Sequence, residues 1–393
     1  MAGNKKINLI EKLIIIYIVL FPFGHLLTLR LTLLGKSIPL NVSDLISFVF
    51  LISFFIKKLR YPTVFLYLKN FLLVALFSNI LFAATNGIGN SIIGSLYFLR
   101  IISYSAMFIV VWNSVSNNKL FFDKIFDYLI IVSFFITIFG WLQYLLYPDL
   151  RSLVIFGWDD HLFRIVGTFI DPTFTAILLV FGILLSLIKY QQTKKGIYAL
   201  ALVPMLLALY FTYSRAGYLS LIAGVLTYLS IKKKIKISFI LIPIFLFGII
   251  FLPRPSSEGV HLERTYSIKA RVANYKETSK IFLKNPIFGV GYNNLCWARN
   301  HYLIDVNNNS NSHSCSGSDS GLLLLLSTTG IVGFIIYVSF LYVLIKTLKT
   351  DYYGIAFVSC FSAILVHSQF SNSIFYPWVL GYFVFLSAVA IKE

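Results

Sequence analysis

Long apolar stretches recur along almost the whole chain, and they constrain the fold more than any other feature. Hydrophobic residues make up 58% of the 393 residues and charged residues only 12%, whereas a soluble domain carries about a quarter charged residues. A soluble fold of this length could not remove so much apolar surface from water, so the surrounding solvent must be lipid. The sequence therefore predicts an all-α polytopic membrane protein.

A membrane-spanning helix needs about 20 apolar residues. On this basis the chain is expected to hold about twelve spans, near residues 8–28, 41–56, 63–83, 91–112, 125–147, 168–188, 197–213, 216–231, 237–252, 321–345, 353–370 and 376–391. The first stretch resembles a signal peptide, but no small-residue cleavage site follows it, so it is expected to remain as the first helix.

Basic residues gather in alternate connections between the spans. The members of this set are Lys5, Lys6, Lys57, Lys58, Arg60, Lys119, Lys124, Lys194, Lys195, Lys232, Lys233, Lys234, Lys236, Lys346, Lys349 and Lys392. By the positive-inside rule this side is cytoplasmic, together with both termini. The net charge of +18 is thus a topology signal, and no nucleic-acid partner is expected. The other side receives residues 29–40, 84–90, 148–167, 213–217, 253–320 and 371–375.

The connection over residues 253–320 is far longer than the others. It divides the chain into nine spans within 1–252, this extracytoplasmic loop, and three spans within 321–393. Cys296 and Cys315 both fall in the loop, where an oxidising compartment would permit a disulfide.

Residues 267–284 of the loop have the spacing of an amphipathic helix. Ile268, Val272, Tyr275 and Phe282 share one apolar stripe. One interpretation is a basic helix that lies on anionic lipid. The other is a helix that directs Arg271, beside the stripe, toward a lipid phosphate. The sequence leaves both open.

Motifs of soluble enzymes are absent from the sequence, since it contains no Walker loop, no GxGxxG after a strand, no HExxH and no CxxC pair. Neither a cofactor nor a metal is expected. The candidates for chemistry are polar residues on the extracytoplasmic face: Arg164, Arg215, Arg264, Arg271, His313 and Asp319, with Arg100 inside the fourth span as a further candidate. Charges in or near a bilayer usually face a cavity or a partner.

Each candidate also has a purely structural interpretation. A single arginine at a helix end often extends to the lipid headgroups, and His313 is one histidine in a polar run of low complexity. Asp319 could cap the following helix, or it could accept a proton from a sugar hydroxyl. Several arginines together with helix ends could instead hold a pyrophosphate without metal.

Four segments in order, RIVGTFIDPT (164–173), TYSRAG (212–217), RVANYKETSKIFLKNPIFGVGYNN (271–294) and DSGLLLLLSTTGIVG (319–333), resemble the O-antigen polymerase and O-antigen ligase superfamily. The resemblance implies a GT-C-like membrane glycosyltransferase of the bacterial inner membrane. Such enzymes take undecaprenyl-pyrophosphate-linked oligosaccharides as donors and use no metal and no nucleotide sugar. The long loop would be a lid over a periplasmic active site.

Carried over by position, the resemblance implies that Arg215 and Arg271 bind the donor pyrophosphate. Arg164 assists them, and Arg264 is grouped with them as a further pyrophosphate ligand. Family ligases place a His-Asn pair where this chain has Asp319 and Ser320. That departure favours a polymerase, and it leaves the catalytic base open between Asp319 and His313.

The sequence thus favours an O-antigen polymerase that joins lipid-linked repeat units into long polysaccharide for lipopolysaccharide. The alternatives are an O-antigen ligase that transfers glycan to lipid A–core, a lipid-linked oligosaccharide transporter, and a purely structural scaffold. The expected partners are the lipid-linked oligosaccharide, membrane lipid and a chain-length regulator protein.

Overall fold

Apolar helices account for most of the structure. The computed structural model describes residues 8–33, 36–156, 158–302 and 317–392. Within these ranges six helices are long and apolar enough to cross a membrane, and six shorter apolar helices accompany them. The class of a largely helical, polytopic membrane protein is therefore confirmed, while the number of helices that cross the bilayer stays a prediction.

The apolar helices agree with the predicted spans to within a few residues at most ends. They are α1 (Leu9–Leu20, continued by the 3-10 helix η1, Phe21–Leu27), α2 (Val42–Ile56), α3 (Thr63–Asn86), α4 (Ile88–Asn117), α5 (Lys119–Leu146), α6 (Pro172–Thr193), α7 (Gly196–Phe211), α8 (Arg215–Ile231), α9 (Ser238–Ile250), α12 (Gly321–Lys346), α13 (Tyr352–His367) and α14 (Pro377–Ala390). The long connection holds α10 (Tyr266–Lys284), as predicted, and the short α11 (Leu295–His301). Further 3-10 helices are η2 (Arg151–Phe156), η3 (Gly167–Phe169), η4 (Ile235–Ile237), η5 (Glu258–Val260) and η6 (Ser373–Phe375).

The sixth helix begins later than the predicted residue 168. Ile170 adopts a left-handed conformation (φ 53°), and Pro172 occupies the first turn of α6. The Asp171 side chain accepts hydrogen bonds from the backbone N–H groups of Thr173 and Phe174. This cap satisfies free donors of the first turn, so the helix starts at Pro172.

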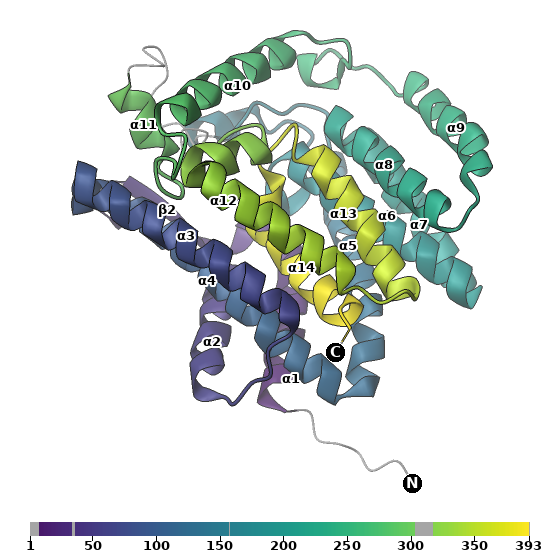
Figure 1. The fold of residues 1–393 in the computed structure, drawn as a ribbon. Helices are drawn as coiled ribbons and strands as arrows, with labels where there is room; N and C mark the ends of the chain where they lie inside the picture. Colours follow the sequence, from purple (N-terminus) through teal and green to yellow (C-terminus); the bar gives the residue numbers. More distant parts are fainter. Residues whose placement is uncertain (1–7, 34–35, 157, 303–316, 393) are drawn as a thin grey trace.

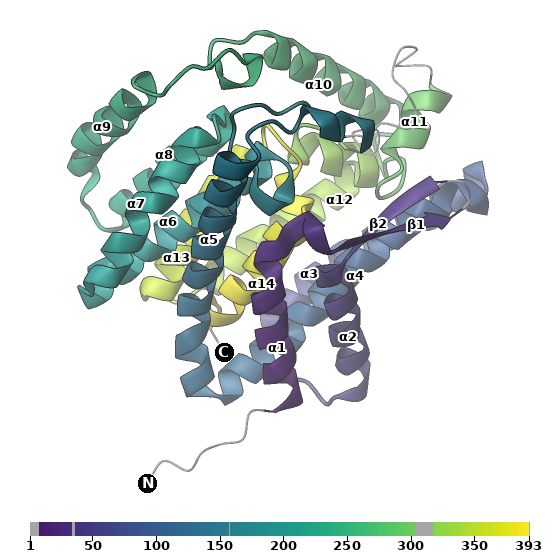
Figure 2. The same ribbon diagram turned by 180° about the vertical axis from the view of Figure 1, so that it is seen from behind.

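A two-stranded hairpin, β1 (Thr28–Leu33) and β2 (Lys36–Asn41), occupies the connection over residues 29–40, for which no strand was predicted. The strands pair antiparallel, with Thr28 opposite Asn41, and they lie beside one end of α3 and α4 (Figure 2). Six residues of alternation are too few to distinguish a strand from a loop in sequence, so the prediction missed this element.

The connections meet at two opposite ends of the helix bundle. At one end the Asn118 side chain donates to the Glu11 carboxylate (2.8 Å), and the Lys349 backbone N–H donates to the Ala390 carbonyl oxygen (2.8 Å). Both α10 and α11 lie at the other end, here named the α10 end (Figure 1). This grouping agrees with the predicted two-sided topology, and the assignment of the first end to the cytoplasm stays a prediction.

A backbone contact fixes the segment after α10 against α12. The Val290 N–H donates to the Ser327 carbonyl (2.9 Å), and the Ile331 N–H donates to the Pro286 carbonyl (2.9 Å). Gly330 interrupts the regular helix with φ 65°, and a Cβ there would overlap the Ile287 carbonyl. Only glycine combines this conformation with so close an approach.

We expect Gly330→Ala to lower the free energy of unfolding by more than ~2 kcal/mol, because it forces a side chain into a left-handed backbone and separates the two segments. Gly89→Ala is the matched control, since the space around Gly89 in α4 is open. Thermal unfolding of both purified variants in detergent checks the difference. Equal midpoints would contradict a tight contact at Gly330.

Candidate active site

Four of the predicted site residues converge at the α10 end although they come from separate segments. Arg164 lies before η3, Arg215 begins α8, Arg264 precedes α10, and Arg271 lies in α10. Arg264 is close enough to each of the other three for their charges to repel, and Arg215 and Arg271 repel in the same way. These four residues are named the arginine cluster.

Arg164 is held inside the protein and does not extend to lipid headgroups. Its side chain is 7% exposed, and its Nε donates to the Thr212 carbonyl oxygen at 2.9 Å. The adjacent Ile165 N–H pairs with the Phe211 carbonyl, which ties this loop to the end of α7. Burial, reinforced by the charge of Arg264, lowers the pKa of Arg164 to about 9.

Arg215 and Arg264 bind the long connection to the end of α8. Arg215 Nη1 donates to the carbonyl oxygens of Leu262 (3.0 Å) and Arg264 (3.2 Å), and its Nη2 donates to Ser267 Oγ (2.6 Å). Arg264 Nη1 in turn donates to two carbonyl oxygens of its own loop. Burial, with the charges of Arg215 and Arg271, lowers the pKa of Arg264 to about 10.

Within the described ranges, carboxylates act on the arginine cluster only without direct contact, as Asp159 and Asp171 do on Arg164 and Glu258 does on Arg264. Among the residues that the structure describes, none of the four guanidinium groups lies within 4.0 Å of a carboxylate. Their hydrogen bonds go to backbone carbonyl oxygens and to one hydroxyl. Such a set of partly buried cations suits a multiply charged anion, because guanidinium groups bind phosphate oxygens in pairs.

Only part of the predicted apolar stripe of α10 faces the protein. Ile268 and Val272 are 49% and 44% exposed, whereas Thr278 and Ile281 are fully buried. The Tyr275 hydroxyl donates to a backbone carbonyl in the turn after α13. The outer side of the helix thus carries both apolar residues and the exposed Lys269, Lys276 and Lys280, while Asn274, Thr278 and Ile281 face the protein. The two sequence interpretations of this segment are therefore compatible.

Asp319 lies beside the arginine cluster and does not cap α12. The cap is Ser320, whose Oγ accepts from a backbone N–H of the first turn at 3.3 Å, so the capping interpretation of Asp319 is wrong. Asn274 of α10 holds Asp319 by accepting its backbone N–H (2.9 Å). Burial raises the pKa of Asp319, and the charges of Arg271 and Arg299 oppose that rise.

Two other predicted features depend on residues outside the described ranges. His313, the alternative base, lies there, and so does Cys315. Cys296 is disulfide-bonded, and Cys360 is free and buried, as expected for a small residue within a helix.

Sequence reasoning missed Asp159 and His161. His161 is 6% exposed. The Asp160 backbone lies near its ring. Neither ring nitrogen forms a hydrogen bond of acceptable geometry with a described residue. Burial, reinforced by the charge of Arg164, lowers the pKa of His161 to about 4, so the ring is neutral near pH 7. Asp159 is exposed and close enough to Arg164, His161 and Asp319 to act on their charges. The segment WDDH in a predicted extracytoplasmic loop was the available signal.

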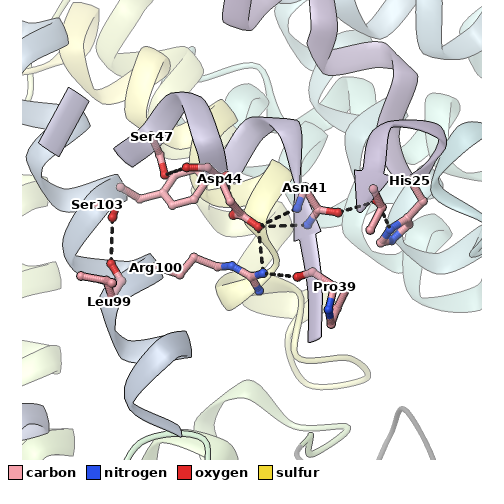
Figure 3. A network of polar contacts seen from close by, with 10 residues as sticks. His25, Pro39, Asn41, Asp44, Ser47, Leu99, Arg100 and Ser103 are labelled. Carbon is pink, nitrogen blue, oxygen red and sulfur yellow. Dashed lines mark hydrogen bonds and ion pairs between the residues drawn. The ribbon is translucent and has the colours of Figure 1, made fainter. Parts of the chain in front are cut away.

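Arg100 differs from the arginine cluster because its charge is compensated. Its Nη2 lies 2.8 Å from Asp44 Oδ2 and donates to the Pro39 carbonyl oxygen at 3.1 Å. Asn41 also donates to Asp44 (Figure 3). Both members of the ion pair are largely buried, with side chains 13% and 1% exposed. Arg100 therefore connects α4 to α2 and to the hairpin.

An apolar cavity lies between α3, α4, α12, α13 and α14. Its walls include Phe71, Phe108, Tyr337, Phe361, Phe375 and Leu380. Phe375 lies in the connection between α13 and α14, and so does Phe370. The centroid of the Phe370 ring lies 5.9 Å from the Arg271 guanidinium carbon. The apolar lining of the cavity suits a hydrocarbon chain.

The described ranges contain no group of three or more His, Cys, Asp or Glu residues that could hold a metal ion. The polar groups at this end include the guanidinium groups, the carboxylates of Asp159, Asp171 and Asp319, and the buried imidazoles of His161 and His367.

Comparison with known families gives one match. Residues 200–338 match the family model described as O-antigen ligase, so the resemblance to the O-antigen polymerase and ligase superfamily is confirmed over about a third of the chain. Members of this family are glycosyltransferase-like enzymes. Arg215, Arg264, Arg271 and Asp319 fall inside the matched residues, and Arg164 precedes them. No curated protein matches the chain.

We expect Asp44→Asn to destabilise the protein by about 3 kcal/mol, because it leaves the Arg100 charge buried without its partner. The double variant Asp44→Asn, Arg100→Met should recover much of that loss, since both charges are then absent. Thermal unfolding of the single and double variants in detergent measures both effects. If the double variant is as unstable as the single one, the ion pair is not the reason that Arg100 is retained.

Proposed function

We propose that this chain, whose residues 200–338 match the family model described as O-antigen ligase, is an O-antigen polymerase of the bacterial inner membrane. It would join undecaprenyl-pyrophosphate-linked repeat units into long polysaccharide on the periplasmic face. The α10 end would then be periplasmic, and both termini would be cytoplasmic.

The observation that carries this proposal is the convergence of four arginines, none of which forms an ion pair with a carboxylate of the described residues. A pyrophosphate supplies several negative charges and oxygen acceptors at one place, which is what such a cluster lacks. Arg215 and Arg271 would hold the donor pyrophosphate, with Arg164 and Arg264 beside them. The cluster would stabilise the charge that grows on the leaving pyrophosphate, and this differential stabilisation lowers the barrier.

The reaction would be a direct displacement at the anomeric carbon of the donor glycan. The acceptor hydroxyl oxygen forms the new glycosidic bond while the bond to the pyrophosphate oxygen breaks, and undecaprenyl pyrophosphate leaves with that electron pair. Asp319 would take the acceptor proton. Its raised pKa suits this role, since a base is most effective when its pKa approaches the working pH.

The remaining parts of the lipid-linked substrate also find suitable surroundings. The polyprenyl chain would lie in the apolar cavity beside α12 and α14. The loop over residues 253–320, with α10 across the α10 end, would be the lid that shields the reacting groups from water. A chain-length regulator protein is the expected partner.

The second candidate is an O-antigen ligase that transfers glycan to lipid A–core, and the description of the matching family favours it. Against it, Asp319 and Ser320 stand where family ligases carry a His-Asn pair. A deletion strain separates the two functions. Loss of a polymerase leaves lipid A–core capped with one repeat unit, whereas loss of a ligase leaves it uncapped.

We expect Arg215→Ala and Arg271→Ala each to abolish long-chain polysaccharide when they are expressed in the deletion strain. Loss of one guanidinium donor to the departing charge costs roughly a hundredfold or more in rate. Lys269→Ala, on the exposed side of α10, is the matched control and should restore the full ladder. Lipopolysaccharide gels and immunoblots of protein level make the measurement. Normal ladders in both arginine variants would overturn the pyrophosphate assignment.

The second expectation concerns pH. If Asp319 is the base, the rate rises with pH as the carboxyl group deprotonates. Because burial raises its pKa, this rise should occur at higher pH than an exposed aspartate would give. Asp319→Asn should lower the rate and remove the rise. Rates of the purified protein with lipid-linked repeat units between about pH 4 and 8 test this. An unchanged pH profile in Asp319→Asn would assign the proton to another group.

A further inference from the structure

A second cluster at the α10 end is aromatic. The His25 ring, in η1, lies with its centroid 4.8 Å from that of Trp158 and 4.6 Å from that of Trp378. The Tyr376 hydroxyl and His25 Nε2 are 3.1 Å apart, and Phe174 stacks on Tyr376 at 3.8 Å. These five residues are named the aromatic cluster. His25, Trp158 and Tyr376 are half-buried, so the cluster borders the surface.

The aromatic cluster adjoins the arginine cluster on two sides. Trp158 is followed by Asp159, which acts electrostatically on Arg164 and on Asp319. Phe174 lies in the first turn of α6, which Asp171 caps, and Asp171 also lies near Arg164. A molecule whose phosphate groups meet the arginines would therefore have its next chemical part beside the aromatic rings.

A chain of polar contacts fixes the position of His25. Its Nδ1 lies 3.4 Å from Thr28 Oγ1, which donates to Asn41 Oδ1 at 2.7 Å. Asn41 donates to Asp44, the buried partner of Arg100. Figure 3 shows how this network leads from His25 to the ion pair. The His25 ring, and with it the rings that contact it, is therefore held in position before a ligand binds, as a recognition site requires.

Three chemical classes could meet such a surface. A phosphate gains little from aromatic rings, and a hydrocarbon chain would fit the apolar cavity elsewhere in the bundle, whose lining residues carry no carboxylate. A sugar ring has an apolar C–H face, which packs on aromatic rings, and a rim of hydroxyls, which donate to carboxylates. The surface beside Trp158 offers both, because Asp159 and Asp160 follow it directly and are exposed.

We propose that the aromatic cluster together with Asp159 is a carbohydrate subsite. It holds the glycan of the lipid-linked substrate next to its pyrophosphate, with a sugar ring against Trp158. The subsite rests on the proposed function in one respect, since the lipid-linked repeat unit is its substrate. Its role is positioning, because it sets where the sugar lies relative to Asp319.

The test uses the full-length protein in lipid nanodiscs with repeat units extracted from the deletion strain. Trp158→Ala should raise the KM for the lipid-linked repeat unit on the order of tenfold and change kcat by no more than about twofold. Trp158→Phe should retain most of the affinity, because it keeps an aromatic face. Asp159→Asn should raise the KM by a smaller factor. Ile155→Ala is the matched control, since this neighbour in η2 is 81% exposed.

A second measurement separates the sugar from the lipid and from the reaction. The repeat-unit oligosaccharide, freed of lipid and phosphate, is titrated against wild type, Trp158→Ala and Ile155→Ala by calorimetry. Binding that weakens only in Trp158→Ala supports the subsite. Equal binding by all three proteins, or no binding by wild type, overturns it. If wild type binds the oligosaccharide through Trp158 but forms no polymer, the proposed function fails and the subsite stands.

Thermal unfolding of the same variants addresses the competing interpretation, in which Trp158 merely packs the loop after α5. In that case Trp158→Ala would lower the unfolding midpoint relative to wild type. Trp158→Phe would have the wild-type midpoint and the wild-type KM. A KM change at an unchanged midpoint contradicts that interpretation.

Discussion

The backbone contact between residues 286–290 and the kink of α12 at Gly330 determines how the α10 end is built. It fixes the C-terminal side of α10 against α12, so the helix crosses the α10 end (Figure 1) and Asn274, Thr278 and Ile281 face the protein. Arg271 then lies over Phe370, and Asn274 reaches the backbone of Asp319.

The protein holds its buried arginine side chains in two different ways. Arg100 is buried beside Asp44, and the pair joins α2 to α4 with its charge neutralised. Arg164 is equally buried but receives a backbone carbonyl as its hydrogen-bond partner. Burying a charge with dipoles alone costs stability. The burial of Arg164 is therefore not explained by a gain in folding stability, whereas Arg215 and Arg264 also attach the long connection to α8.

Three surroundings in the protein match the three chemical parts of an amphipathic, lipid-linked molecule. The apolar cavity lies within the helices, the arginine cluster lies at their ends, and the aromatic cluster borders it. These are suited respectively to a hydrocarbon chain, to phosphate groups and to sugar rings. The family match covers the arginines of α8 and α10. His25 and Trp158 fall outside the matched residues. We therefore expect the aromatic cluster to differ from one family member to another and to determine which glycan this chain accepts.

The sequence by itself determined the membrane class, the helices and the long loop, because continuous apolar stretches admit almost no other secondary structure in lipid. It also identified Arg164, Arg215, Arg264, Arg271 and Asp319 as candidates, since charged residues are rare in such a chain. Only the tertiary structure decided which side of α10 faces inward, that Ser320 and not Asp319 caps α12, and that Arg100 is neutralised. It alone brought His25, Trp158 and Tyr376 together. These outcomes depend on contacts between residues far apart in the chain, and helical periodicity carries no information about which partner a face will meet.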